Sequence, residues 1–253
     1  MSKIKLSDIS TRADENKDKK EIKEKTAEML TEIDELQNLL YAEGKNSLLV
    51  ILQGMDASGK DGVIRNVFGS LNPEGVMVKS FKAPTNEELK HDFLWRVHPH
   101  APAKGMIQLF NRSHYEDILT TRVHGWCNDD LAEKRMMAIN DWEDLVAQHN
   151  NTSILKFYLH VSYKEQQERL AERMNDTTKM WKYNANDVKE SKHWDTYMKM
   201  YEDCFANCNK IPWHIIPSDQ NWYKEYLISG KVLETLSGLK MKFPSLADKN
   251  DEK

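Results

Sequence analysis

Short apolar runs alternate with longer segments of helical spacing along this chain. Ser47–Gln53 (SLLVILQ) is a continuous apolar run, and its length and β-branched content are typical of a strand buried in a parallel sheet. Similar runs predict four further strands, over residues 76–81, 105–111, 153–161 and 213–218.

Apolar residues at helical spacing fill the segments between these runs. Asn128 is expected to cap a long helix over 129–149, whose core-facing residues we predict to be Leu131, Trp142, Leu145 and Val146. Strands that alternate with helices imply an α/β fold, with right-handed crossovers and a five-stranded parallel sheet that carries helices on both faces. The predicted helices cover residues 20–43, 61–71, 86–97, 129–149, 163–174, 187–208 and 221–237.

The length of 253 residues suits a single domain, which we expect over residues 21–240. Residues 1–20 are rich in charge and are expected to form a flexible, solvated N-terminal arm, and residues 241–253 an irregular tail. Hydrophobic residues make up 40% of the chain, but no apolar run approaches the roughly 18 residues of a membrane span, and the start lacks the features of a signal peptide. We therefore expect no contact with a membrane.

Net charge and cysteine content narrow the picture further. A net charge of −4 argues against a nucleic-acid binder, so any site for a polyanion must be a local group of lysines and arginines. Cys127, Cys204 and Cys208 indicate free thiols in a reducing compartment, and we expect a cytoplasmic protein. Cys204 and Cys208 lie one helical turn apart, which favours a half-buried helix face over a metal pair because no second ligand pair lies nearby.

The segment GMDASGKD matches the phosphate-binding pattern G-x-x-x-x-G-K between a predicted strand and a predicted helix. Two glycines permit backbone angles that point N–H groups at phosphate oxygens, the following helix N-terminus adds its positive end, and Lys60 adds a point charge. The residues expected to bind phosphate are Gly54, Met55, Ala57, Ser58, Gly59, Lys60 and Asp61.

This loop departs from the usual pattern at Asp61, where a serine or threonine normally provides a hydroxyl group for Mg²⁺. A second carboxylate, Asp56, lies inside the loop. Phosphates repel a carboxylate unless a cation lies between them, so we expect Mg²⁺ or Mn²⁺ to be held partly by acidic residues. For Asp61 a role in the first turn of the helix remains an equal alternative.

The third predicted strand ends in NRSHYED, where ligands of parallel sheets bind. Arg112 is expected to grip phosphates, with a surface pair to Glu116 as the alternative. A metal-binding strand would normally end in an aspartate, but this strand ends in Asn111, and Glu116 or Asp117 is a candidate for the missing carboxylate. His114 is expected to be a polar cap or a satisfied histidine rather than a catalytic group.

A polar stretch near residues 170–188 has the position of a lid over the phosphates. Arg169 and Arg173 share a helix face, and Lys179 and Lys182 follow between helices. A solvated helix with internal ion pairs is an equal alternative, because glutamates are interleaved with these cations.

Three segments together resemble the family 2 polyphosphate kinases: GMDASGKDG (54–62), FNRSHYEDIL (110–119) and RMNDTTKMWKYNANDV (173–188). The resemblance covers roughly residues 20–240. It implies a thymidylate-kinase-like fold of the P-loop kinase type, a helical lid, Mg²⁺ dependence, and exchange of phosphoryl groups between inorganic polyphosphate and nucleotides.

Carried over by position, the resemblance gives roles to individual residues. Asp56 would hold metal and orient the acceptor phosphate, and Lys60 and Arg112 would bind the phosphates in flight. Arg122 would contact phosphate, whereas Asn111 stands where some branches have aspartate, which bears on whether AMP or ADP accepts phosphate. Arg173, Lys179 and Lys182 would belong to the lid.

The expected partners are polyphosphate and the nucleotides ADP, AMP and ATP, with GDP or GMP as further candidates, and we expect a homo-oligomer. Two other readings stay open. One is an ATP-dependent nucleoside monophosphate kinase, against which Asp61 counts. The other is a nucleotide-binding module without turnover, which Lys60, Arg112 and the lid cations disfavour.

Overall fold

A five-stranded sheet, with all strands parallel, forms the centre of the computed structural model, which describes residues 4–245. The order of the strands in space is β2-β3-β1-β4-β5. All five predicted strands are confirmed, with ends that differ by one or two residues. They are β1 (Ser47–Gln53), β2 (Val76–Ser80), β3 (Ile107–Asn111), β4 (Thr152–His160) and β5 (Trp213–Pro217).

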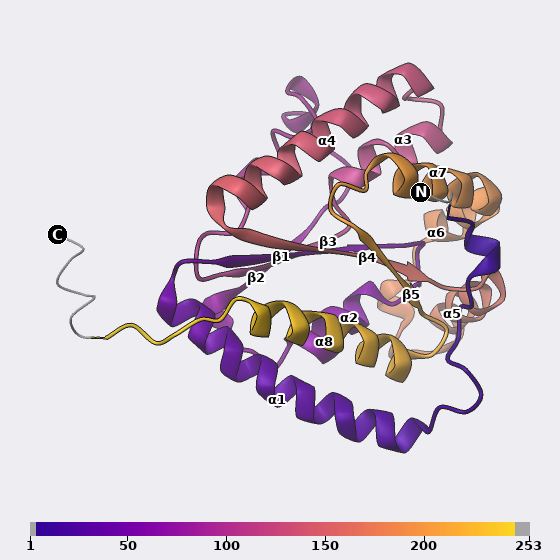
Figure 1. Cartoon of the computed structure of the whole chain (residues 1–253). Coiled ribbons are helices and arrows are strands. Elements are labelled where there is room, and N and C mark those ends of the chain that lie inside the picture. The colour runs from indigo at the N-terminus through magenta and orange to yellow at the C-terminus, as the bar shows by residue number, and fades with distance from the viewer. Residues whose placement is uncertain (1–3, 246–253) are drawn as a thin grey trace.

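Helices cover both faces of this sheet (Figure 1). One face carries α1 (Lys19–Glu43), α2 (Lys60–Phe68) and α8 (Asn221–Gly238). The other face carries α3 (Thr120–Val123), α4 (Asp129–Asn150) and α7 (Trp194–Asn207). Because both faces are covered, the central strand β1 is buried along its whole length, which explains its continuous apolar run.

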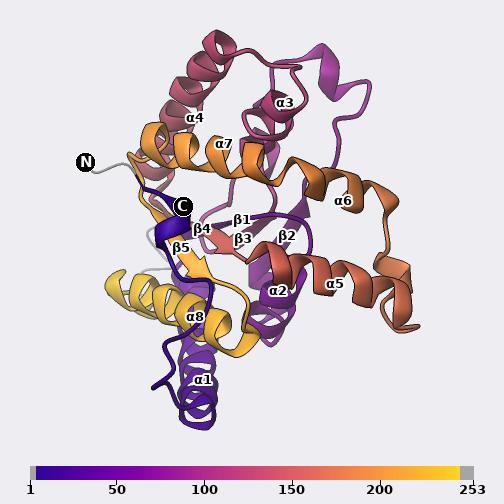
Figure 2. The same cartoon turned by 90° about the vertical axis from the view of Figure 1, so that its right-hand side faces the viewer.

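Two helices extend from the carboxyl ends of the strands, α5 (Tyr163–Asn175) and α6 (Ala185–Glu190) (Figure 2). The segment predicted as one helix over 187–208 is divided, because a 3₁₀ turn at Ser191–His193 separates α6 from α7. The other 3₁₀ turns are Leu6–Asp8, Pro73–Gly75, Glu88–Lys90, His98–His100, His114–Asp117 and Met180–Lys182.

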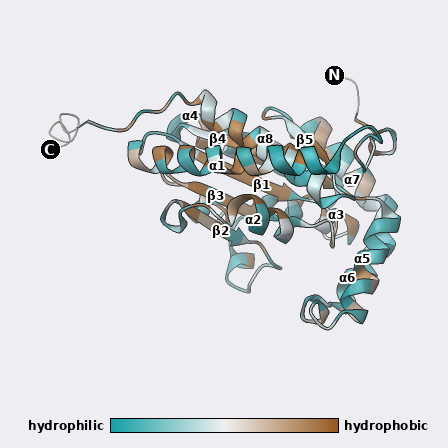
Figure 3. Cartoon of the chain, turned by 90° about the horizontal axis from the view of Figure 1, so that it is seen from below, coloured by the Kyte–Doolittle hydropathy of each residue, from teal (hydrophilic) through white to brown (hydrophobic). Residues whose placement is uncertain are grey.

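Hydropathy follows this layered arrangement. Brown, apolar residues gather on the strands, whereas α5, α6 and the outer faces of the covering helices are mostly teal (Figure 3). None of the helices within residues 4–245 combines the length and apolar character that a membrane span requires.

The helix predicted over residues 86–97 is wrong. This segment forms a short 3₁₀ turn, Glu88–Lys90, followed by further turns. Thr85 and Glu88 exchange backbone–side-chain hydrogen bonds, and the Asp92 side chain accepts the N–H of Leu94, 3.0 Å away. The Thr85–Glu88 pair is a capping box, which favours the start of a helix, but the turn at Asp92 interrupts the segment after the short 3₁₀ turn. The apolar residues reach the core from an irregular loop instead.

The predicted core face of α4 is partly wrong. The Asn128 cap is confirmed, because its side chain accepts the N–H of Leu131, and Trp142 and Val146 are buried as expected. Leu131 and Leu145, however, are 41% and 47% exposed. The buried face is rotated toward a polar residue that hydropathy does not identify as core, Glu143.

Glu143 belongs to a fully buried ionic cluster between α4 and β4. The Lys156 Nζ atom lies 2.7 Å from Glu143 Oε2 and 2.9 Å from Tyr115 Oη, and the Tyr115 hydroxyl donates to Glu143 Oε1 over 2.6 Å. Lys156 also donates to the carbonyl oxygen of Cys208. The cluster therefore links α4 and β4 to the segment that follows β3.

The expected solvated N-terminal arm is wrong for residues 4–13, which contact β4, α7 and the segment after β5, whereas residues 14–18 are exposed as expected. Leu6 is buried, and its N–H donates to Glu202 Oε1 over 2.8 Å. The Thr11 hydroxyl donates to Asp219 Oδ2 over 2.9 Å, and His160 contacts the carbonyl oxygens of Leu6 and Ile9. Isolated apolar residues and backbone groups anchor this segment, although its composition is that of a solvated arm.

Residues 241–245 are irregular, as predicted for the C-terminal tail, and residues 246–253 of that tail lie outside the described residues, as do residues 1–3. All three cysteines are free and buried, so Cys204 and Cys208 are more completely buried than the half-buried helix face that we expected.

Glu143→Gln should destabilise the fold, because it leaves the Lys156 ammonium buried without its carboxylate. Breaking a buried pair typically costs about 3–5 kcal/mol. For a chain of this size we expect the melting temperature to fall by roughly 6–20 °C, measured by circular dichroism.

The matched control is Asp141→Asn, an exposed carboxylate on the same helix, which should change the melting temperature little. The double substitution Glu143→Leu with Lys156→Met should recover much of the loss, because it removes both charges. An unchanged melting temperature in Glu143→Gln would contradict the structural role of this pair.

Candidate active site

The phosphate-binding loop follows β1 directly and leads into α2. Gly54, Ala57 and Gly59 have positive φ angles of 149°, 62° and 100°. A Cβ atom on Gly54 would lie 2.9 Å from the carbonyl oxygen of Leu159, so this position requires glycine both for its backbone angle and for space. The backbone N–H groups at the start of α2 complete an anion-binding site.

Lys60 is buried at the first position of α2 and folds back over the loop. Its Nζ atom donates to the carbonyl oxygens of Gly54 and Met55, at 2.7 and 3.1 Å. Burial and then the charge of Arg112 lower the Lys60 pKa to about 8, while Asp56 opposes the shift. A bound phosphate would favour the charged form and restore a higher pKa.

Arg112 and Asp56 form an ion pair between the segment after β3 and the phosphate loop. Arg112 has a left-handed backbone with a φ of 60°, and its N–H donates to the carbonyl oxygen of Leu52 in β1 over 3.0 Å. The pKa of Arg112 lies above its usual value, chiefly because of Glu116, with Asp56 as a further cause. The structure thus brings together all three residues predicted to be catalytic.

Asn111 and Asp61 contact each other rather than lying apart. The Asn111 amide donates to Asp61 Oδ1 over 2.9 Å, and Lys182 of the lid lies 3.5 Å from Asp61 Oδ2. Burial opposes ionisation of Asp61, but the Asn111 hydrogen bond and the cations Lys182 and Lys60 leave its pKa below the usual value. Asp61 is therefore a carboxylate at neutral pH.

A cavity of ≈ 670 Å³ opens beside the loop. Arg96 bonds the Asp117 carboxylate at 3.4 Å, and burial raises the pKa of Asp117. Glu116 accepts a hydrogen bond from Thr120 over 2.7 Å. The predicted site residues that line this cavity are Gly54, Met55, Asp56, Arg112, Glu116 and Asp117.

The predicted metal ligands are Asp56, Asn111, Asp61, Glu116 and Asp117. Within residues 4–245, no three side chains of histidine, cysteine, aspartate or glutamate come close enough to hold a metal ion by themselves. Asp56 and Glu116 line the cavity, and Mg²⁺ usually binds through one or two carboxylates together with substrate phosphates and several waters.

Two of the four predicted lid cations, Arg173 and Lys182, pair with carboxylates of the cavity or of the phosphate-loop region. Arg173 of α5 pairs with Asp187 of α6 at 2.7 Å, and Asp187 lines the cavity. Lys182 reaches Asp61, as described above. Lys179 pairs with Glu172 and Asp176 at the surface, which matches the alternative reading of a solvated helix for this residue.

Two predicted site residues are occupied elsewhere. Arg122 pairs with Asp129 and Asp203, each at 2.7 Å, and does not line the cavity, because α3 turns it toward α4 and α7. Arg169 is not free to act as a lid cation. Its guanidinium contacts Glu165 at 2.9 Å and donates to four backbone carbonyl oxygens, those of Ala57, Ser58, Ser218 and Asp219.

Other cavity residues were missed in the sequence. Arg96 is buried and bonds the carbonyl oxygen of Lys82, but it lies in the wrongly predicted helix. Arg135 of α4 bonds the carbonyl oxygen of Asp117 over 2.7 Å. No motif marks these arginines, because their partners, two backbone oxygens and the Asp117 carboxylate, lie outside their own segments of the sequence.

His114 is buried 3.7 Å from Glu143 and lies outside the cavity lining. Neither ring nitrogen has a hydrogen-bond partner among the described residues, and Ser113 is the cap of this turn, so the expected polar cap or satisfied histidine is wrong.

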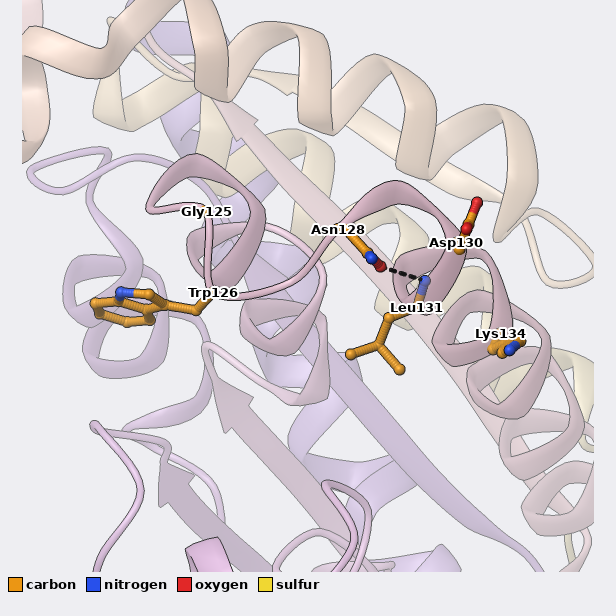
Figure 4. Close-up of a pocket in the computed structure, with 6 residues that line it drawn as sticks. All are labelled: Gly125, Trp126, Asn128, Asp130, Leu131 and Lys134. Atoms are coloured by element: carbon orange, nitrogen blue, oxygen red, sulfur yellow. Dashed lines mark hydrogen bonds between the residues drawn. The ribbon is translucent and has the colours of Figure 1, made fainter.

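A second hollow, of ≈ 480 Å³, lies between the end of α3 and the first turns of α4 (Figure 4). Asn128 caps α4 there, while Trp126 stands apart on the other side. Its lining contains none of the phosphate-loop residues, but it shares Trp126 with the cavity beside that loop.

The combination of this loop, Arg112 and the helical lid agrees with the comparisons to known proteins. A family model described as polyphosphate kinase 2 matches residues 16–244. The chain belongs to the polyphosphate kinase 2 family. The predicted family, the P-loop kinase fold and the enzyme class, a phosphotransferase acting between polyphosphate and nucleotides, are thereby confirmed.

Individual polyphosphate kinases show how close the similarity is. The AMP/ADP-polyphosphate phosphotransferase of Meiothermus ruber is 46% identical over 84% of this chain and 80% of its own length. The ADP-polyphosphate phosphotransferase of Rhodopseudomonas palustris is 40% identical over 84% of this chain and 78% of its own. The crystal structure of polyphosphate kinase 2 from Arthrobacter aurescens TC1 is 38% identical, has a TM-score of 0.93, and is matched over 97% of this chain and 89% of its own.

Lys60→Ala should lower kcat by about 10²-fold or more, because the lysine acts where charge develops in the transition state. Steady-state kinetics with polyphosphate and ADP measure this effect, and circular dichroism checks that the fold is intact. The matched control is Arg65→Ala, an exposed cation on the same helix, which should leave kcat near the wild-type value. A near-normal kcat in Lys60→Ala would contradict the role of the loop lysine.

Arg173→Ala should lower kcat/KM by roughly 10- to 10³-fold, within the range of lost charge contacts, and should change the melting temperature little. The ion pair with Asp187 joins two lid helices near the cavity, and such pairs contribute little to global stability when they are partly exposed.

Lys164→Ala is the control on the same helix, because this lysine is largely exposed and, within residues 4–245, forms an ion pair with Glu168 alone. Its kinetics should match those of the wild type. Normal kinetics in Arg173→Ala, or a large fall in melting temperature with a proportionate loss of activity, would refute the lid assignment.

Proposed function

We propose that this protein reversibly transfers the terminal phosphoryl group of inorganic polyphosphate to ADP or AMP, with GDP and GMP as weaker candidates. The observation that carries the proposal is the meeting of Lys60, Arg112 and Asp56 at the loop beside a cavity large enough for a nucleotide. Arg173 and Lys182 lie across from them on the lid helices.

The proposed reaction needs positioning and neutralisation of charge rather than a strong base. The second pKa of a phosphate monoester is about 6, so the terminal oxygen of the acceptor is ionised at neutral pH. This oxygen attacks the terminal phosphorus of polyphosphate, a new P–O bond forms, and the P–O bond to the shortened chain breaks. Both bonds are phosphoanhydrides when ADP accepts, which supports a reversible reaction.

Each residue then has a defined task. Lys60 and Arg112 bind the oxygens of the transferring phosphoryl group, and Asp56 orients Arg112 and the acceptor phosphate. Lys182 and Arg173 approach from the lid, where closure excludes water that would otherwise hydrolyse the donor.

We propose Mg²⁺ or Mn²⁺ as the cofactor. Asp56 and Glu116 line the cavity, and Asp61 is an ionised carboxylate at the start of α2. The bound cation would neutralise phosphate charge. Asp56 is the candidate ligand that lies in the loop itself, and a bound cation would share its carboxylate with Arg112, as it would share that of Asp117 with Arg96.

Acceptance of both AMP and ADP is supported by the Meiothermus ruber relative, whose name includes both nucleotides, and ADP is also in the name of the Rhodopseudomonas palustris relative. The match to the polyphosphate kinase 2 family argues against an ATP-dependent monophosphate kinase, the alternative that donor choice tests. Asp61, in place of the usual serine or threonine, disfavours that alternative.

Location and assembly are proposals too. The three buried free thiols support a reducing compartment, the cytoplasm. The edge strand β2 exposes Met77 and Val78, which supports a homo-oligomer because exposed apolar edges favour association.

Polyphosphate with ADP or AMP should yield ATP or ADP, and turnover should cease in excess EDTA and return with Mg²⁺. Chromatographic separation of the nucleotides measures this outcome. Affinity for polyphosphate should fall by at least about tenfold between 50 and 200 mM salt, because a polyanion bound by several cations releases counterions.

The control reaction replaces polyphosphate with ATP as donor and AMP as acceptor. Efficient transfer from ATP, with polyphosphate inert, would establish the monophosphate-kinase alternative. Full turnover in excess EDTA would contradict the metal requirement.

A further inference from the structure

The phosphate loop is held on the side away from its substrate. Loop N–H groups that point at phosphates leave carbonyl oxygens pointing outward. The Arg169 guanidinium binds two of these oxygens, those of Ala57 and Ser58, at 3.0 and 3.2 Å. Lys224 of α8 approaches the Ser58 oxygen at 3.4 Å, so two cations meet the back of the loop.

Lys224 fits closely against Gly59. A Cβ atom on Gly59 would collide with Lys224 Nζ and would lie 3.7 Å from the Arg169 guanidinium. Gly59 is therefore required both for its φ of 100° and for the approach of the lysine. The Lys224 ammonium takes the place that a side chain at this loop position would fill.

The Lys224 charge lacks an ordinary countercharge. Its side chain is 0% exposed, its remaining hydrogen bond goes to Asn221 Oδ1 at 2.9 Å, and no carboxylate within residues 4–245 forms an ion pair with it. A buried charge without a partner is strongly disfavoured. A polyanion on the loop would provide the missing negative charge.

The pKa of Lys224 agrees with its burial and its lack of a paired carboxylate in the described part of the chain. Burial first, and then Arg169 and Lys60, lower the Lys224 pKa to about 7, while Glu225 and Glu165 oppose the shift. A bound polyanion favours the charged form, so Lys224 should take up a proton when phosphate binds at pH 8.

We propose that Lys224 is a positioning residue for phosphate binding, which supports the loop at Gly59 from behind and whose charge is balanced only when phosphate occupies the loop. The inference rests on the proposed function, because it assigns the loop to polyphosphate. Lys224 acts by supporting the loop and by the electrostatic attraction of its charge for the phosphates, not by touching the substrate.

The test compares Lys224→Met with Lys231→Met, which removes an exposed lysine from the same helix. Titration calorimetry with tripolyphosphate at pH 8, in two buffers of different ionisation enthalpy, gives both affinity and proton uptake. Lys224→Met should bind roughly 10- to 100-fold more weakly and take up fewer protons than the wild type. Lys231→Met should match the wild type in both.

The melting temperature distinguishes the proposal from a merely structural role. If Lys224 only stabilised the fold, its removal would lower the melting temperature, whereas the proposal expects no fall. Because the native pKa of Lys224 is lower than its unfolded value, the unfolded chain binds the extra proton between these values, and wild-type stability rises with pH over that range. Lys224→Met removes this penalty. Without ligand, its melting temperature should equal or exceed that of the wild type, and by more at pH 6 than at pH 9.

Unchanged affinity and proton uptake in Lys224→Met would overturn the proposal, and so would a lower melting temperature with a proportionate loss of binding. Lys224→Gln, which keeps a donor near Ser58 without the charge, replaces the methionine variant if that variant does not fold. If the wild type binds tripolyphosphate but does not transfer it to ADP, the proposed function fails and the binding comparison still decides the role of Lys224. If the wild type binds only ATP, ATP serves as the probe.

Discussion

The ion pair between Arg112 and Asp56 is the interaction on which the rest of the candidate site depends. It joins the loop after β1 to the segment after β3, two neighbouring strands of the sheet. The arginine adopts a left-handed backbone there, and Gln166 of α5 donates to the Asp56 carbonyl oxygen over 3.1 Å. One aspartate thus ties the phosphate loop, the third strand and the base of the lid together.

The position of Arg112 depends on buried contacts of the segment that carries it. Tyr115, three residues after Arg112, bonds the buried Glu143 and Lys156, so α4 and β4 fix the segment that carries the arginine. On the other side of the loop, Arg169 binds outward carbonyl oxygens. The cations proposed to bind the substrate are therefore held by a framework of other cations and carboxylates, which can keep a site rigid before a polyanion binds.

The sequence predicts the parts of the molecule in which local pattern and tertiary environment agree. The strand Ser47–Gln53 is apolar throughout because both sheet faces are covered, and the loop that follows is marked by glycines whose backbone angles no other residue tolerates well. Prediction fails where a polar residue decides the packing. Glu143 rotates the core face of α4, and the Asp92 side chain accepts the N–H of Leu94 in a turn that interrupts the expected helix. Arg169 shows the same limit, because spacing places it beside Arg173 and cannot show that backbone oxygens engage its guanidinium.

The contact between Asn111 and Asp61 explains how the loop tolerates its unusual residue. An ordinary loop of this type has a hydroxyl group after the lysine and an aspartate at the end of the neighbouring strand. Here the carboxylate stands after the lysine and a neutral amide ends the strand, and the two side chains lie 2.9 Å apart. The exchange preserves one carboxylate and one neutral hydrogen-bonding group at this place. It moves the negative charge to the first turn of α2, where the helix N-terminus stabilises it and Lys182 of the lid reaches it. Asp61 thereby forms an ion pair with the lid residue Lys182. A serine or threonine at this position carries no charge and could not form it.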